Sequence, residues 1–251
     1  MIFFKIFIYT IILCFFCTSA HSHNPDDFVI SEIEQGQLIF ENELIASEYN
    51  AALKRMRIRK LESMSFQRKS IIFTKAGFEH IIPKGLDHIL FVLGLFFSSL
   101  RIGPLLWQVT AFTIAHSITL ILAGLGIFYI SGAIVEPLIA LSIIWIAIEN
   151  CLFKKPSKSR FIVVFLFGLL HGLGFASMIS QYGLPKDNLI SLLLAFNIGV
   201  EIGQLTILII AYLIVKNILN KIWQSDKIRI PVSIIIGLTG LFWLTERIMN
   251  I

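Results

Sequence analysis

Ionisable side chains lie inside segments that are otherwise apolar enough to cross a membrane. They are His116, His171, Glu201 and the adjacent pair Asp87 and His88. An imidazole or a charge in hydrocarbon is costly, so such residues usually face a bundle interior or a wet cavity and mark an ion pathway. Imidazole nitrogen with carboxylate oxygen suits Ni²⁺, Co²⁺ or Zn²⁺, and the absence of a thiolate cluster argues against Cu⁺. These residue types therefore indicate a route for a divalent metal cation.

Each of these residues also has a purely structural interpretation. Asp87 could cap the start of a helix, because carboxylates stabilise helix N-termini. His116 and His171 could be buried histidines bonded to neighbouring helices, and Asn197 and Gln204 could hold two helices together. The sequence alone leaves both interpretations open.

Composition indicates an all-α polytopic membrane protein. Of 251 residues, 56% are hydrophobic and only 15% are charged, and the mean hydropathy is +0.82. Soluble domains are less apolar than this. The net charge is +5, but the basic residues lie in short loops between apolar runs, so we expect no nucleic-acid partner.

No enzyme is expected, because the chain has neither a GxSxG nucleophile turn nor a CxxCH haem attachment site. Three cysteines are too few and too poorly placed for a disulfide framework. A haem protein with His116 and His171 as paired axial ligands is the weaker alternative to metal transport.

The N-terminus has the layout of a secretory signal peptide over residues 1–20. Lys5 precedes an apolar run, and the small residues Thr18, Ser19 and Ala20 end it. We predict cleavage after Ala20, with an uncleaved anchor as the alternative. Residues 21–75 would then form an exported, periplasmic helical segment. Its new terminus, His21-Ser22-His23, could bind Ni²⁺ or Cu²⁺ in a square plane, or be a flexible linker.

Residues 76–251 are predicted to form a transmembrane domain of six helices. Spanning the hydrocarbon takes about 20 helical residues. Only 12 uncharged residues separate His88 from Arg101, so the first span is predicted to begin at Pro83, which draws Asp87 into the membrane. The further spans are predicted at about 104–127, 133–153, 161–180, 189–215 and 230–248.

Lysine and arginine gather at Arg101 and in the loops around 154–160 and 216–229. The positive-inside rule places these loops in the cytoplasm. We therefore expect a bacterial inner-membrane protein whose mature N-terminus and C-terminus lie outside. The bilayer and a divalent metal ion are the expected partners, and homo-oligomerisation is left open.

Polar residues of two predicted spans recur at three- and four-residue steps, which aligns them on one helix face. The stripes are Thr110, Thr113, His116 and Ser117, and Asn197, Glu201 and Gln204. Gly199 and Gly203 form a GxxxG notch that admits a neighbouring helix, and Gly168 and Gly172 flank His171. Close backbone packing is therefore expected at both places.

The predicted depths arrange these groups as stepping stones for a cation. His80, Asp87, His88 and Glu136 are placed toward the outside; His116, His171, Asn197 and Glu201 near the midplane; Glu149 and Asn150 near the inner surface, with Glu149 solvated. Phenylalanine and tryptophan are expected mostly to face lipid.

Four motifs resemble the HupE/UreJ family, particularly its branch with an exported N-terminal segment. They are His80-Ile-Ile-Pro-Lys-Gly-Leu-Asp87-His88, Ala115-His116-Ser117, Gly168-Leu-Leu-His171-Gly172 and Phe196-Asn197-Ile-Gly-Val-Glu201-Ile-Gly203-Gln204. The resemblance covers about residues 76–249 and leaves 21–75 unmatched. It implies a hydrogenase- or urease-accessory membrane protein that acts as a nickel or cobalt permease. Six residues separate His80 from Asp87, where the better-known nickel permeases have five, and a helical spacer would therefore rotate His80 by ~100°.

Together these observations predict a permease that binds nickel, or next cobalt, as a transported ion, with no tightly bound cofactor. The alternative is a metal-binding accessory protein that does not transport. The predicted ligands are Asp87, His88, His116, His171 and Glu201, with Asn197 and Gln204 as oxygen donors and His80 and Glu136 as outer ligands.

Overall fold

The computed structural model describes residues 43–98, 102–128, 130–153, 157, 159–182, 188–215 and 226–249. For residues 43–46 and 176–182 it describes the backbone alone. The predicted signal peptide, its cleavage site and the His21-Ser22-His23 terminus lie outside the described residues.

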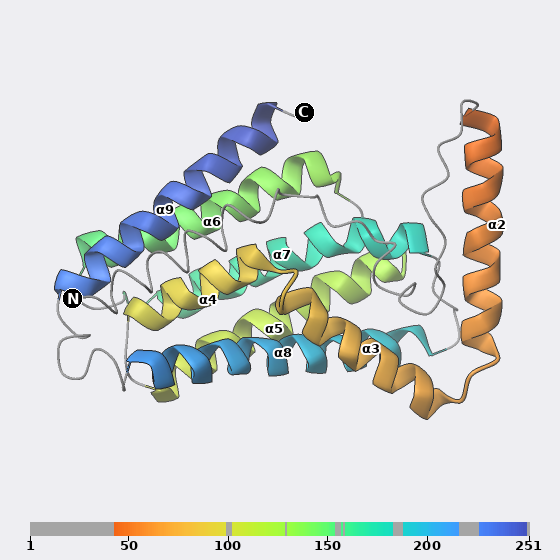
Figure 1. Cartoon of the computed structure of the whole chain (residues 1–251), viewed down its shortest axis with the longest axis horizontal. Helices are drawn as coiled ribbons and strands as arrows, with labels where there is room; N and C mark the ends of the chain where they lie inside the picture. The colour runs from red at the N-terminus through yellow and green to blue at the C-terminus, as the bar shows by residue number, and fades with distance from the viewer. Residues whose placement is uncertain are drawn as a thin grey trace.

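Every regular element in the described ranges is a helix, which confirms the all-α prediction. The helices are α2 (Glu43–Glu62), α3 (Phe66–Ile81), α4 (Leu86–Ser98), α5 (Ile102–Gly124), α6 (Gly132–Leu152), α7 (Arg160–Tyr182), α8 (Leu189–Ile214) and α9 (Asp226–Met249). Figure 1 shows α4 to α9 running along the long axis, while α2 stands across one end.

Four helices, α5, α6, α8 and α9, are each long and apolar enough to cross a membrane. The pair α3 and α4 makes a fifth candidate if it counts as one span bent by 68°, and α7 is apolar over the shorter stretch Arg160–Phe175. The chain is therefore a multi-pass membrane protein. Large apolar side chains on the outer faces agree with this, since Trp107 is 69% exposed and Leu152 is 71% exposed.

The first predicted span, placed from Pro83 on, starts too early. α4 begins only at Leu86 and has 13 residues, and α3 precedes it after a short break. Ile82 is extended because the ring of Pro83 disfavours a helical conformation in the residue before it. Gly85 then turns the chain where a side chain would meet the backbone of Ile81. The predicted boundary between residues 75 and 76 falls inside α3.

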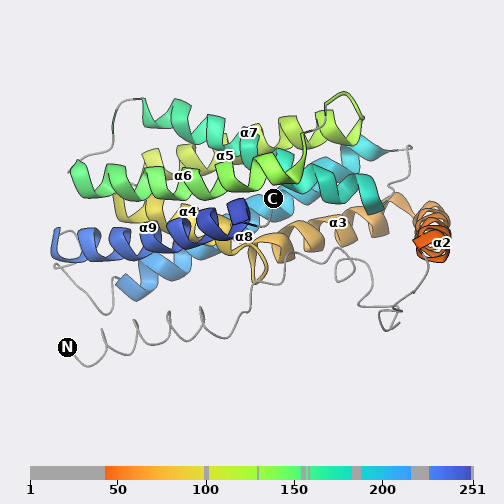
Figure 2. The same ribbon diagram turned by 90° about the horizontal axis from the view of Figure 1, so that it is seen from above.

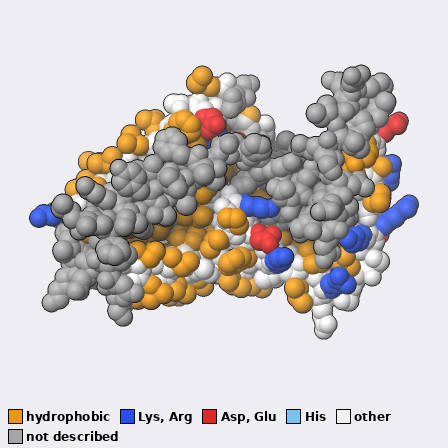
Figure 3. All heavy atoms as spheres, viewed as in Figure 1, with side chains coloured by type: hydrophobic (Ala, Val, Ile, Leu, Met, Phe, Trp, Pro, Cys, Tyr) orange, Lys and Arg blue, Asp and Glu red, His pale blue; other side chains and the backbone are white. Residues whose placement is uncertain are grey.

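α4 is the central helix of the bundle. It contacts α5, α6, α8 and α9, and nine of its residues are buried. The other helices pack around it largely as the pairs α3 with α8, α5 with α7 and α6 with α9, an arrangement that can be followed in Figure 2. On the face shown in Figure 3, hydrophobic side chains spread over the bundle, and charged ones gather mainly toward the end that holds α2 and α3.

Glycines set two of these helix pairs at short distance, as the sequence predicts. A β-carbon at Gly199 on α8 would lie 2.7 Å from the backbone nitrogen of Phe78 on α3, and one at Gly203 would lie 2.8 Å from the β-carbon of Ile81. The Thr74 hydroxyl of α3 also donates to the Ala195 carbonyl at 3.1 Å. Thus α3 packs directly against α8.

The second close pair is α5 with α7, beside His171. Added β-carbons at Gly168 and Gly172 would each lie 3.0 Å from an α-carbon of α5, that of Phe112 and that of His116. The crowding that was expected around His171 is therefore present, and it brings α7 directly onto the helix turn that carries His116.

Gly199→Ala is expected to lower stability by about 1 to 3 kcal/mol, because the added methyl group forces α3 away from α8. Gly103→Ala is the matched control, since nothing lies within 4 Å of a β-carbon there. Thermal unfolding of both variants in detergent measures the difference. Equal melting temperatures would contradict the close helix contact.

Candidate metal centre

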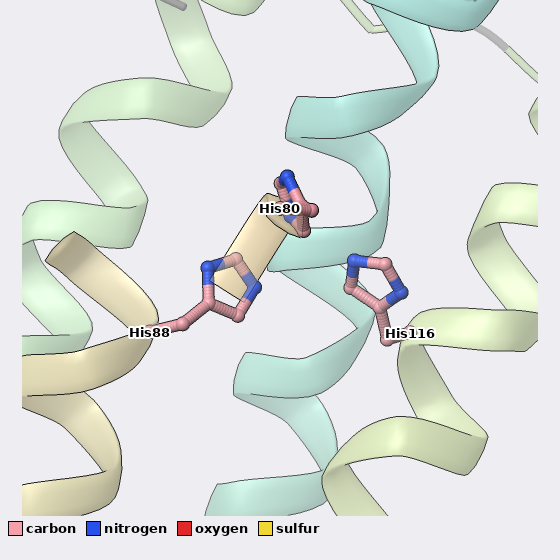
Figure 4. Close-up of side chains that lie close together, drawn as sticks. All are labelled: His80, His88 and His116. Carbon is pink, nitrogen blue, oxygen red and sulfur yellow. The ribbon is translucent and has the colours of Figure 1, made fainter. Parts of the chain in front are cut away.

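Four buried histidines from four helices meet in the middle of the bundle. His80 (α3), His88 (α4) and His116 (α5) offer ring nitrogens that all lie within 4.8 Å of one another, and Figure 4 shows the three rings gathered between their helices. His171 on α7 adjoins them, with its ring centroid 4.9 Å from that of His88. None of the four is more than 4% exposed. The arrangement can hold one cation by three nitrogen atoms, with a fourth next to them.

The break between α3 and α4 places His80 beside His88. Their ring centroids are 4.9 Å apart, although the residues belong to helices bent by 68°. The rotation of His80 that a helical spacer would cause does not occur, because residues 82–85 are not helical. The extra residue between His80 and Asp87 is accommodated in this turn, so His80 lies with the other buried histidines.

Hydrogen bonds fix which nitrogen of each ring faces the centre. Nδ1 of His88 lies 2.9 Å from Oδ1 of Asp87, and Nδ1 of His171 lies 2.8 Å from the carbonyl oxygen of Phe167. A carboxylate or a carbonyl can only accept, so both Nδ1 atoms carry the proton. The lone pair of each ring is therefore on Nε2.

His116 is fixed in the same way by a residue of α8. Its Nδ1 lies 2.9 Å from Oδ1 of Asn197, whose Nδ2 donates to the Leu193 carbonyl at 2.8 Å. That second bond orients the amide so that its oxygen faces His116. Asn197 thus positions a ligand.

The Nε2 atoms of His88, His116 and His171 are buried and have no hydrogen-bond partner among the described residues. A buried polar atom without a partner is costly and calls for an explanation. Metal-binding histidines usually donate from one ring nitrogen to an oxygen while the other binds the ion. The three rings have this arrangement, which is compatible with a metal ion bound through Nε2.

Asp87 serves mainly to orient His88. Its Oδ1 accepts from both the backbone nitrogen and Nδ1 of His88, at 2.8 and 2.9 Å. It is also the acidic residue in the first turn of α4, so the structural and functional interpretations of this residue both apply.

The predicted polar stripes of α5 and α8 do face each other. Thr110 donates to Oε1 of Glu201 at 2.7 Å, and Thr113 donates to Oε1 of Gln204 at 2.9 Å. The described structure does not bring Glu201 into the group of ligands that could share one ion. Glu201 and Gln204 therefore form a polar layer next to the centre.

Glu136 and Glu149, the predicted outer and inner stepping stones, are not part of the histidine group. Glu136 is exposed on α6, where its backbone carbonyl accepts from Arg247 of α9 at 2.7 Å. Glu149, predicted to be solvated, is only 8% exposed and pairs with Arg160. The prediction for Glu149 is wrong because Arg160 folds into the bundle instead of remaining in the loop.

Phenylalanines enclose the histidine group on two sides. The sequence had predicted that most phenylalanines face lipid. Phe175 and Phe196 stack at 4.7 Å, and Phe175 lies 4.4 Å from the ring of His80. Phe112 lies 4.9 Å and Phe91 5.5 Å from the ring of His171.

The spacing of these phenylalanines in the sequence could have predicted their contact with the histidines. Phe91, Phe112 and Phe175 each stand three or four residues from a histidine, and so share its helix face. Phe112 also contacts both His116 and His171, whose ring centroids lie 6.3 and 4.9 Å from its own.

The fold and the site together define a multi-pass helical membrane protein with a buried histidine group that is compatible with a metal ion. The chain belongs to the HupE/UreJ family: the family model described as HupE / UreJ protein matches residues 55–247, about three quarters of the sequence. The family is associated with nickel or cobalt uptake or with accessory roles. The match begins earlier than predicted and includes all of α3 and the last part of α2, from residue 55 on. No curated protein and no solved structure matches the chain.

Asn197→Leu is expected to weaken Ni²⁺ binding by about 10- to 100-fold, because the His116 ring loses the acceptor that fixes its proton on Nδ1. Ser117→Ala is the control, since Ser117 is next to His116 but bonds only to the Thr113 carbonyl of its own helix. Calorimetric titration of the purified proteins in detergent measures both affinities. Unchanged binding by Asn197→Leu would refute the positioning role.

Proposed function

We propose that this protein is a permease that carries a divalent transition metal into the cell, with nickel first and cobalt next. The observation that supports this most directly is the convergence of buried, unbonded imidazole nitrogens from α4, α5 and α7 beside His80. Membership of a family associated with uptake of these metals agrees with it.

The donor set favours divalent ions late in the first transition series. Imidazole suits Ni²⁺, Co²⁺ and Zn²⁺, and a soft ion such as Cu⁺ would need thiolate or thioether ligands. Cys151 is the one cysteine among the described residues, and it is not part of the histidine group. Three or four nitrogen donors would replace most of the water ligands that the ion loses on leaving solution.

We further propose a cleaved signal peptide over 1–20 and six crossings by α4 to α9 in a bacterial inner membrane. Of the basic residues in the two predicted loops around 154–160 and 216–229, the described Arg160, Lys227 and Arg229 lie in the first turns of α7 and α9, at the end of the bundle where these helices begin. The positive-inside rule makes that end cytoplasmic. The end with α2 then faces outward, the mature N-terminus and C-terminus lie on that side, and the metal moves from α2 toward the end of α4.

Transport requires that the ion be bound firmly enough to enter and loosely enough to leave. Phe175 and Phe196 cover the histidines on one side, and Phe91 and Phe112 on the other. The aromatic layers keep water from the rings, so the site is occluded in this conformation. Passage requires each layer to part in turn.

Vesicles that contain the purified protein should accumulate Ni²⁺, and the double variant Asp87→Ala with His88→Ala should accumulate about as little as protein-free vesicles. The double variant removes one ligand and the carboxylate that orients it. Ser117→Ala should retain full uptake. If the unaltered protein binds Ni²⁺ yet does not move it, the accessory function replaces the permease.

A further inference from the structure

A buried ionic network lies at the other end of α4, away from the histidines. Arg160, the first residue of α7, is 2% exposed, and its Nη1 lies 3.4 Å from Oε2 of Glu149 on α6. Both Nη1 and Nη2 of Arg160 donate to Oδ1 of Asn150, at 3.3 and 3.4 Å. A carboxylate and an amide oxygen thus hold one buried cation, the guanidinium group.

The network ties three helices together. Nδ2 of Asn150 donates to the carbonyl of Gly94 on α4 at 2.8 Å, and the backbone nitrogen of Ser157 donates to Oε1 of Glu149 at 3.1 Å. The amide of Asn150 is therefore oriented with its oxygen toward Arg160. Two of the three helices, α4 and α7, also carry histidines of the metal centre.

The network and the metal centre lie along one face of α7. Arg160, Val164, Phe167 and His171 follow at steps of four, three and four residues, which places them on that face. On α4, Gly94 follows His88 by six residues, a distance of ~9 Å along the helix. The rings of Phe91 and Phe167 meet at 6.0 Å between the two sites. Eleven residues of helix separate Arg160 from His171, a distance of ~16 Å.

Stability alone gives a poor account of this pair. Burying a guanidinium and a carboxylate removes the hydration of both, and apolar residues of similar volume are often as stable or more so. The oxygens of Glu149 and Asn150 are instead arranged as a cation site, and the cation in it belongs to the protein.

We propose that Glu149 and Asn150 form the exit site for the transported divalent cation, and that the guanidinium of Arg160 keeps this site closed until it withdraws. The proposal rests on the permease function above. Carboxylate and amide oxygens bind Ni²⁺ or Co²⁺ less tightly than imidazoles do. An ion that passes from the histidines to these oxygens therefore moves toward release. Arg160 can withdraw by moving the first turn of α7 without displacing the turn that carries His171.

Calorimetric titration of the full-length protein with Ni²⁺ tests this assignment by stoichiometry. The unaltered protein should bind one equivalent, because Arg160 occupies the second site. Arg160→Gln should bind a second, weaker equivalent, whose X-ray absorption spectrum shows oxygen ligands and no added imidazole. Arg160→Lys keeps a cation and should bind one equivalent. Arg160→Gln with Glu149→Gln should also bind one, since the carboxylate is gone.

The same titration measures binding at the histidine site separately. His88→Ala with Arg160→Gln should lose the tight equivalent and keep the weak one, so failure at one site is distinguishable from failure at the other. A single equivalent in folded Arg160→Gln, or a second equivalent that survives Glu149→Gln, overturns the exit site.

A second measurement tests the exit site if Arg160→Gln does not fold. Glu149→Gln preserves an oxygen acceptor for Arg160 and should leave Ni²⁺ affinity at the histidines unchanged while lowering vesicle uptake about 10-fold, as loss of one charged ligand by the exit site would do. Uptake equal to that of the unaltered protein overturns the proposal.

Discussion

Each imidazole in this bundle must be held by one nitrogen so that the other remains available to an ion. Asp87, Asn197 and the Phe167 carbonyl supply the acceptors, and each of the three histidines that they hold keeps its lone pair on a buried Nε2. Asp87 and the Phe167 carbonyl lie on the same helices as the rings they hold, whereas Asn197 reaches His116 from α8. The placement of the helices therefore determines which nitrogen of His116 is available and whether the rings meet. Loss of one hydrogen bond frees the ring to rotate and to exchange its proton between nitrogens.

Small residues and one broken helix produce that placement. Gly199 and Gly203 let α3 lie against α8, and Gly168 and Gly172 let α7 lie against α5. The interruption after Ile81 then turns the chain so that α4 can enter the middle of the bundle. A continuous helix could not present His80 and His88 to the same point, because it would extend past the centre.

Helical periodicity was sufficient to predict the parts of the site that lie within single straight helices. The facing stripes of α5 and α8, the notch at Gly199 and the crowding at His171 follow from spacing alone. The turn at Pro83 could not be placed in this way, because a pattern of apolar residues does not reveal which neighbour a bent chain will contact.

Arg160 was assigned to a cytoplasmic loop, since a positive charge beside a span usually stays in water. Its burial depends on oxygens that Glu149 and Asn150 contribute from another helix. Phe175 and Phe196 were assigned to lipid for a similar reason, as residue type does not distinguish a bilayer from a protein interior.

The central position of the histidine group has an electrical consequence. His171 is the twelfth of the 23 residues of α7, and α3 packs on α8 before α4 begins, so the group lies well inside the layer that the helices cross. In the proposed orientation, an ion that reaches the histidines from outside has crossed part of the voltage drop, and it crosses the rest on its way to the cytoplasm. A doubly charged ion gains ~4.6 kcal/mol over a full drop of 100 mV, and that energy would be divided between its arrival at the histidines and its departure inward.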